Sequence, residues 1–225
     1  AGYVSTSQNP SITNVPLTSA GLYSVTVTIA SCTSAVATTT VVVNPTPATP
    51  TATSNGPICS DSTLTLAAST TSTMPVTWSW IGPNAFGSSL QNPQIVGATA
   101  AASGTYQVIA TATTGPCPSL QGSINVVVNP TPKITGVTGT NPTTCNGNQG
   151  TITLTGLAPT VTYTVKYLRN GILVTTSLPS NASGVLVIPN LTAGIYSNIF
   201  VVSPVPASCP SNSVGPVTLL DPNPP

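Results

Sequence analysis

Leu22-Tyr23-Ser24-Val25-Thr26-Val27-Thr28-Ile29 is the stretch that decides the fold class, because apolar side chains alternate in it with small polar ones. The same period of two returns in residues 63–66, 151–155 and 163–167. This alternation is typical of half-buried antiparallel strands, and no segment has a helical period with helix start and stop signals. Arg169-Asn170-Gly171-Ile172, between two such runs, predicts a two-residue type I′ hairpin. The sequence therefore predicts an all-β protein.

An internal repeat organises the chain. Val41-Val42-Val43-Asn44-Pro45-Thr46-Pro47 returns unchanged, 85 positions later, as Val126-Val127-Val128-Asn129-Pro130-Thr131-Pro132. Upstream, Tyr23 matches Tyr106 at an offset of 83, and Cys32 matches Cys117 at an offset of 85. Two residues are therefore inserted in the second copy, in a predicted loop around Thr114-Gly115.

The repeat divides the chain into three units, which we call the first module (residues 1–47), the second module (48–132) and the third module (133–225). Modules of roughly 85–90 residues with turn residues every ten or so positions fit seven-strand immunoglobulin-like sandwiches better than a propeller or a solenoid. The proline-rich boundaries favour extended, semi-rigid linkers. We therefore expect tandem antiparallel β-sandwiches arranged as a stiff string of beads, with a proline-rich terminal linker after the third sandwich.

The first module is predicted to be the C-terminal half of a sandwich, incomplete at its N-terminus. At an offset of 83, Tyr3 matches Phe86, so this module has no counterpart of Cys59 or of the strand containing Trp78 and Trp80. The chain is then either a window from a longer polypeptide, which is the simpler reading, or a protein whose missing strands another chain donates. A third reading, in which Cys32 is a free thiol on an intact small domain, requires a sandwich of about 47 residues and is the least favoured.

Charge excludes several classes of function. The 225 residues include 3 Lys and Arg, 2 Asp and Glu and no His, which is 2% charged where an ordinary domain has roughly 25%. The chain therefore offers no histidine-based triad, no histidine metal site and no carboxylate pair within one module. With a net charge of +1 it has no basic patch for nucleic acid or an anionic membrane surface. We predict no enzyme activity, no cofactor, no metal, no nucleic-acid partner and no membrane insertion in this segment.

The five cysteines are the most informative residues, and we expect structural disulfides because zinc would need thiolates clustered in fours. Cys59 and Cys117 bracket the second module, and Cys145 and Cys209 bracket the third. The sequence thus predicts one disulfide in each complete module, with Cys32 unpaired in this chain. Disulfides also predict a location outside the cytoplasm.

Several stretches resemble a known group of modules. They include Cys59-Ser60-Asp61-Ser62-Thr63-Leu64, Trp80-Ile81-Gly82-Pro83-Asn84-Ala85-Phe86 and Ser103-Gly104-Thr105-Tyr106. Together with Cys145-Asn146-Gly147-Asn148-Gln149-Gly150 of the third module, they are similar to the Ig-like, PKD-like modules repeated in giant surface proteins, adhesins and filament proteins of Bacteroidetes-type bacteria. The resemblance covers nearly the whole chain and implies display on the bacterial cell surface, without naming a ligand.

Two smaller features suggest binding or modification. Trp78 and Trp80 lie at i and i+2 and would form a sugar-stacking platform if either ring were free, but a sandwich core explains them better. Asp61-Ser62-Thr63 resembles an O-glycosylation signal of these bacteria, so Ser62 is a candidate for modification.

The sequence thus favours a structural segment of an extracellular filament or stalk adhesin, whose partners are neighbouring modules or copies of the same protein. A nearly uncharged surface lacks the repulsion that keeps proteins apart, which also favours lateral association. The alternative is a ligand-binding adhesin module that recognises a glycan or a host surface protein.

Overall fold

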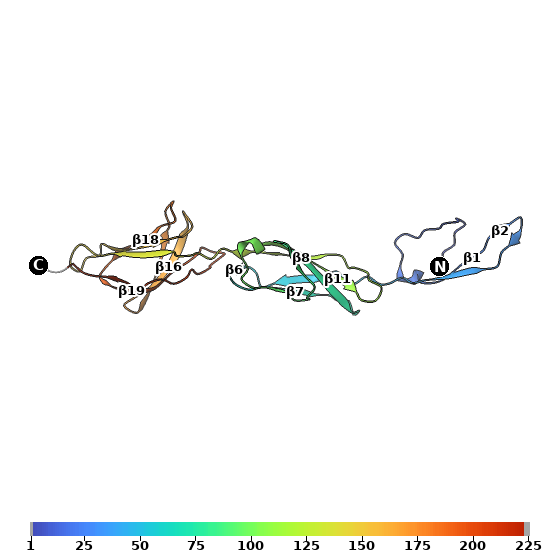
Figure 1. Ribbon diagram of the computed structural model, residues 1–225, viewed down its shortest axis with the longest axis horizontal. Helices are drawn as coiled ribbons and strands as arrows, with labels where there is room; N and C mark the ends of the chain where they lie inside the picture. Colours follow the sequence, from blue (N-terminus) through green and yellow to red (C-terminus); the bar gives the residue numbers. More distant parts are fainter. Residues whose placement is uncertain (1, 223–225) are drawn as a thin grey trace.

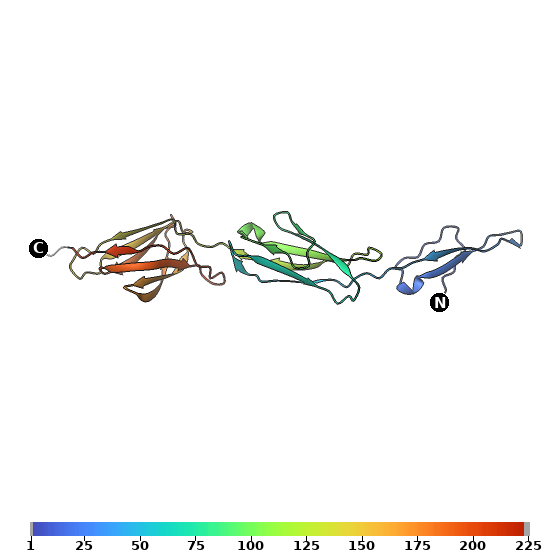
Figure 2. The same cartoon turned by 60° about the horizontal axis from the view of Figure 1, so that its bottom comes forward.

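The chain is described by a computed structural model that covers residues 2–222. Figures 1 and 2 show an elongated row of strand groups, with the N-terminal strands at one end of the row and the C-terminus at the other. Strands make up nearly all of the regular structure, and the two helical pieces in the described residues are single 3₁₀ turns, η1 (Leu17–Ser19) and η2 (Ala100–Ala102). The predicted all-β class is confirmed.

The second module forms a complete two-layer sandwich. One sheet has the strand order β10-β7-β5 and the other β12-β11-β8-β9, all antiparallel, and a short parallel pair joins β13 to β6 at one end. Alternation aims Leu64 and Leu66 of one sheet at Trp80, Tyr106 and Val108 of the other, and all five are buried. The strands are β5 (Thr51–Ser54), β6 (Ile58–Cys59), β7 (Leu64–Ser69), β8 (Val76–Gly82), β9 (Phe86–Ser88), β10 (Gln94–Ile95), β11 (Gly104–Ala112), β12 (Gly122–Val126) and β13 (Val128–Asn129).

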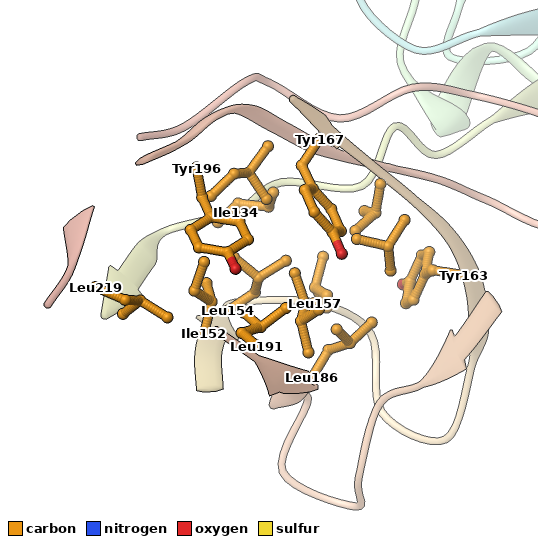
Figure 3. Packing of buried hydrophobic residues seen from close by; sticks show 14 residues of the cluster. Ile134, Ile152, Leu154, Leu157, Tyr163, Tyr167, Leu186, Leu191, Tyr196 and Leu219 are labelled. Atoms are coloured by element: carbon orange, nitrogen blue, oxygen red, sulfur yellow. The ribbon is translucent and has the colours of Figure 1, made fainter. Parts of the chain in front are cut away.

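The third module repeats this plan with a sheet β14-β15-β18 packed on a sheet β17-β16-β19-β20. Its core gathers apolar side chains from both sheets around Tyr167 and Tyr196, whose ring centroids lie 5.7 Å apart (Figure 3). The predicted hairpin is confirmed, since Arg169 pairs with Ile172 and both Asn170 and Gly171 have positive φ. The strands are β14 (Gly136–Thr140), β15 (Gly150–Thr155), β16 (Thr162–Arg169), β17 (Ile172–Pro179), β18 (Leu186–Leu191), β19 (Gly194–Val202) and β20 (Val217–Leu219).

The first module has only two short hairpin sheets. β1 (Gly21–Val25) pairs with β4 (Ala37–Val41), and β2 (Thr28–Ile29) pairs with β3 (Cys32–Thr33) at the tip. Gly21 pairs with Val41 as Gly104 pairs with Val126 and Gly194 with Leu219, so β1 and β4 occupy the places of the last two long strands of a complete module. No residue from 2 to 46 is buried.

A tyrosine is the third residue of β1, β11 and β19, one strand in each module. The hydroxyls of Tyr23, Tyr106 and Tyr196 donate to the carbonyl oxygen four residues upstream, at 2.9, 2.9 and 2.8 Å. This tyrosine corner is a hallmark of immunoglobulin-like sandwiches. Together with the three-stranded and four-stranded sheets, it identifies the fold from the molecule itself.

Candidate functional site: the junctions between modules

A disulfide joins two different modules. Cys59 of the second module is bonded to Cys209 of the third, with Cα atoms 5.6 Å apart. Cys117 and Cys145 are free, as is Cys32. The predicted pairs Cys59–Cys117 and Cys145–Cys209 are therefore wrong in this structure.

The reason is that the two cysteines of one module lie at opposite ends of its sandwich. Cys59 pairs in register with Asn129, where the chain leaves the second module. Cys117 follows the far end of β11, where its carbonyl accepts a hydrogen bond from the amide of Ala112 at 3.1 Å. A nine-residue strand spans about 30 Å, whereas a disulfide needs Cα atoms within roughly 7 Å. Cysteines that bracket a module in sequence thus cannot meet within it.

The linker between the second and third modules is fastened at both ends. Thr131 donates its amide and its hydroxyl to Ser60, which follows Cys59, at 2.9 and 3.1 Å. Three residues on, Ile134 exchanges two hydrogen bonds with the side chain of Asn212, at 2.8 and 3.0 Å. Ile134 is itself buried in the core of the third module. The disulfide and these bonds make the junction a continuous, cross-linked segment rather than a free hinge.

A Cys-x-Ser motif, which the sequence analysis did not identify, fixes the loop that carries Cys209 and two equivalent loops. Three cysteines are each followed two positions later by a serine: Cys32 by Ser34, Cys117 by Ser119 and Cys209 by Ser211. Each serine hydroxyl accepts a hydrogen bond at 3.0 Å from an amide near the end of the preceding long strand, that of Val27, Ala110 or Val201. We call Cys32, Cys117 and Cys209 the loop cysteines. The Cys-x-Ser spacing, present three times, was the signal available in the sequence.

The other cysteine type lies where its module's chain departs. Cys59 and Cys145, which we call the exit cysteines, both precede the second long strand of their module. Cys145 Sγ lies 3.8 Å from the carbonyl oxygen of Pro222, which stands three positions after Leu219 as Asn129 stands three after Val126. Each exit cysteine therefore lies beside the equivalent residue of its own module's departing chain.

The two tryptophans belong to the core. Trp80 is 1% exposed, and its indole nitrogen donates to the carbonyl of Gln91 at 3.3 Å. Trp78 is half-buried and packs against the same cluster. Trp80 therefore presents no free ring for sugar stacking, and Trp78 is partly covered by the core.

The remaining candidate residue, Ser62, is exposed on the turn after Cys59, next to Asp61 with its φ of 66°. Its O-glycosylation stays a prediction. Within residues 2–222, no three His, Cys, Asp or Glu side chains gather where they could hold a metal ion. Over the same range, no helix is long and apolar enough to span a membrane.

Comparison with known proteins adds a fold likeness only. No protein-family profile matches the chain, and no curated protein matches it. Among solved structures, murine CEACAM1b matches with 16% sequence identity and a TM-score of 0.43, over 76% of this chain and 99% of that one. A mouse coronavirus receptor-binding domain complexed with its murine receptor matches with 17% identity and a TM-score of 0.40, over 76% and 100%. Such low TM-scores carry no argument about function, so the fold assignment rests on the strand orders and registers above.

Proposed function

We propose that this chain is a structural segment of an extracellular filament or stalk adhesin on a bacterial surface, and that it acts mechanically rather than as an enzyme. The observation that carries the proposal is the Cys59–Cys209 disulfide. It bonds the exit cysteine of the second module to the loop cysteine of the third module. A bond in this position does not hold one module's fold together. It fixes the spacing and limits the separation of two consecutive modules.

The disulfide also changes the path that a pulling force follows. It links residues 150 positions apart, so load passes from Cys59 directly to Cys209. Strands β7 to β13 of the second module and β14 to β19 of the third lie inside the closed loop and are bypassed. Unfolding of either module then lengthens the chain very little, which is the property that a stalk needs.

The surface suits packing of many modules. The chain has a net charge of +1 and only five charged side chains, so neighbouring modules or copies are not held apart by repulsion. The burial of Trp80 and the packing of Trp78 disfavour the alternative, a module that stacks a glycan on an exposed indole.

Single-molecule stretching of the chain from its two ends tests this function. The oxidised chain should extend far less than the reduced chain, and reduction should release a contour of about 500 Å, since each residue contributes roughly 3.4 Å over the 150-residue separation. A Cys145→Ser variant is the matched control and should extend like the unmodified chain. Equal extension of the oxidised and reduced chains would contradict a load-bearing role for the bond.

A further inference from the structure

We infer that the disulfides of this protein follow one rule, by which an exit cysteine bonds only to the loop cysteine of the module stacked after it. Cys145 is then a covalent docking site for the loop cysteine of a further Ig-like module, and Cys117 is the receiving half of the equivalent bond between the first and second modules. The inference deepens the proposed structural role and rests on it. Neither Cys117 nor Cys145 has a partner within residues 2–222.

The completed junction defines the geometry. Between the second and third modules, the exit cysteine Cys59 pairs in register with Asn129, and the loop cysteine Cys209 reaches it and bonds. Asn129 is three positions after Val126, the residue that faces Gly104 across the sheet. This position, which we call the junction residue, is occupied by Asn44 in the first module and Pro222 in the third, by the equivalent pairs Gly21–Val41 and Gly194–Leu219.

The two free cysteines each lie at a junction residue. Cys117 Sγ is 3.9 Å from the carbonyl oxygen of Asn44, so the loop cysteine of the second module has already reached the junction before it. The fit there is close, because a Cβ added to Gly115 of the same loop would lie 2.1 Å from the amide nitrogen of the Asn44 side chain. Cys145 Sγ lies 3.8 Å from the carbonyl oxygen of Pro222, so the third module presents the other half. The junction residue Asn129 thus has both an exit cysteine and a loop cysteine beside it, and the two are bonded. Asn44 has only a loop cysteine beside it, and Pro222 has only an exit cysteine.

The two ends of the molecule carry complementary free cysteines, a loop cysteine at one end and an exit cysteine at the other. Cys32 is an exposed loop cysteine on the β2–β3 hairpin, at the tip of the row opposite the C-terminus (Figure 1). Its serine, Ser34, makes the same 3.0 Å hydrogen bond as Ser119 and Ser211, so the bonding loop is formed even without a complete sandwich around it. A second copy of the chain therefore supplies a suitable partner for Cys145. Such a contact is heterologous and repeats head to tail.

The bond forms by ordinary thiol–disulfide exchange. The two thiols lose two protons and two electrons as the S–S bond forms, and a small-molecule disulfide such as oxidised glutathione accepts them and leaves as two thiols. In an uninterrupted array these bonds overlap, because the loop closed by Cys59 and Cys209 contains both Cys117 and Cys145. Each module would then lie within two overlapping disulfide-closed loops. Under tension, only the short stretches between consecutive bonds, such as residues 117–145, would carry the load.

The test uses the full chain, concentrated in a glutathione redox buffer, with a second copy as the probe. Interchain disulfides are mapped by mass spectrometry of unreduced peptides. We expect a ladder of oligomers in which Cys145 is bonded to Cys32 about tenfold more often than to another Cys145, since docking raises the effective concentration of the matched pair. Cys145→Ser should abolish these bonds, whereas Thr143→Ser in the same segment should leave them unchanged.

Three results would overturn the rule: Cys145–Cys145 bonds as frequent as mixed ones, Cys145 recovered only as its glutathione adduct, or a bond between Cys59 and Cys117. This experiment identifies which cysteines pair and applies no force, whereas the stretching experiment measures the mechanical effect of the Cys59–Cys209 bond alone. Failure of the pairing rule is therefore distinguishable from failure of the proposed mechanical role.

Discussion

The first and second modules contain the same pair of strands in two different surroundings. β1 and β4 pair in the same register as β11 and β12, with the same corner tyrosine and the same serine-held loop. Yet Val25 is 62% exposed where its equivalent Val108 is 0% exposed, and Val41 is 37% exposed where Val126 is 1% exposed. The strand pair is thus specified by local sequence, while its burial is supplied entirely by the opposite sheet.

This difference separates two contributions that are normally mixed. Hydrogen-bonded pairing, the corner and the loop are present in both modules, and the apolar area removed from water is present in only one. Burying a valine side chain fully stabilises a fold by roughly 1.5–3 kcal/mol. Substitutions at equivalent positions should therefore have large effects in the second module and small ones in the first.

The largest contrast is expected for a carboxylate placed at the two valines. Val108→Asp buries an unpaired charge, which costs roughly 3–5 kcal/mol, a large share of the stability of a small domain. Val25→Asp places the same group in water and should change stability by less than about 0.5 kcal/mol. Urea unfolding followed by tryptophan fluorescence measures the first change, because Trp78 and Trp80 both lie in the second module, and circular dichroism measures the second. Equal effects of the two substitutions would mean that the β1–β4 face is covered in solution.

The junction disulfide is expected to have the next largest effect. Replacing Cys59 and Cys209 together by Ala should lower the free energy of unfolding by about 2–4 kcal/mol, because the bond restricts the unfolded chain over a separation of 150 residues. Cys32→Ala, at the exposed equivalent of Cys209 in the first module, is the control and should have little effect. Thermal unfolding in oxidising buffer measures both. An unchanged midpoint in the double variant would show that the bond constrains position only.

The sequence was sufficient for much of this architecture. Period-two alternation placed strands at β1, β7, β15 and β16, the Asn170-Gly171 pair located a hairpin, and the repeat aligned β1 with β11 in the register that the sheets adopt. These features are local in the sequence or are repeated along it, so they can be recognised without knowledge of the tertiary contacts.

The disulfide pairing was not predictable in the same way. The sequence places Cys59 and Cys117 in one module but does not say that the first follows a strand at one end and the second a strand at the other. Their separation follows from the direction of β11 through the sandwich, which is a property of the assembled sheets. The loop cysteines could have been recognised earlier, since Cys-x-Ser occurs at Cys32, Cys117 and Cys209 and distinguishes them from the exit cysteines.

The corner tyrosines give a smaller contrast between the two modules. Tyr106→Phe removes the hydroxyl that donates to Ala102 inside the core and should lower the free energy of unfolding by about 1 kcal/mol. Tyr23→Phe removes the equivalent bond to Ser19 at a half-buried site, where water can replace it, and should have a smaller effect. Fluorescence-monitored urea unfolding measures the first change and circular dichroism the second. A larger loss for Tyr23→Phe would contradict the comparison.

The smallest effect is confined to alkaline pH. Burial raises the pKa of Tyr106 above its usual 10.0, and burial likewise raises the pKa of Tyr167, with the Tyr196 phenol adding to the rise and Arg169 opposing it. Because the folded state holds these protons more tightly than the unfolded state, their stabilising contribution is complete below the unfolded pKa of about 10 and is lost as pH rises through the folded values. The urea midpoint of the second module should therefore fall above about pH 10, and the fall should shrink in Tyr106→Phe. Alkylation of the free thiols beforehand removes their titration from the measurement. The first module has no comparably buried tyrosine, so we expect no such alkaline loss from its phenols. A urea midpoint that falls equally in Tyr106→Phe would assign the alkaline loss of the second module to groups other than the Tyr106 phenol.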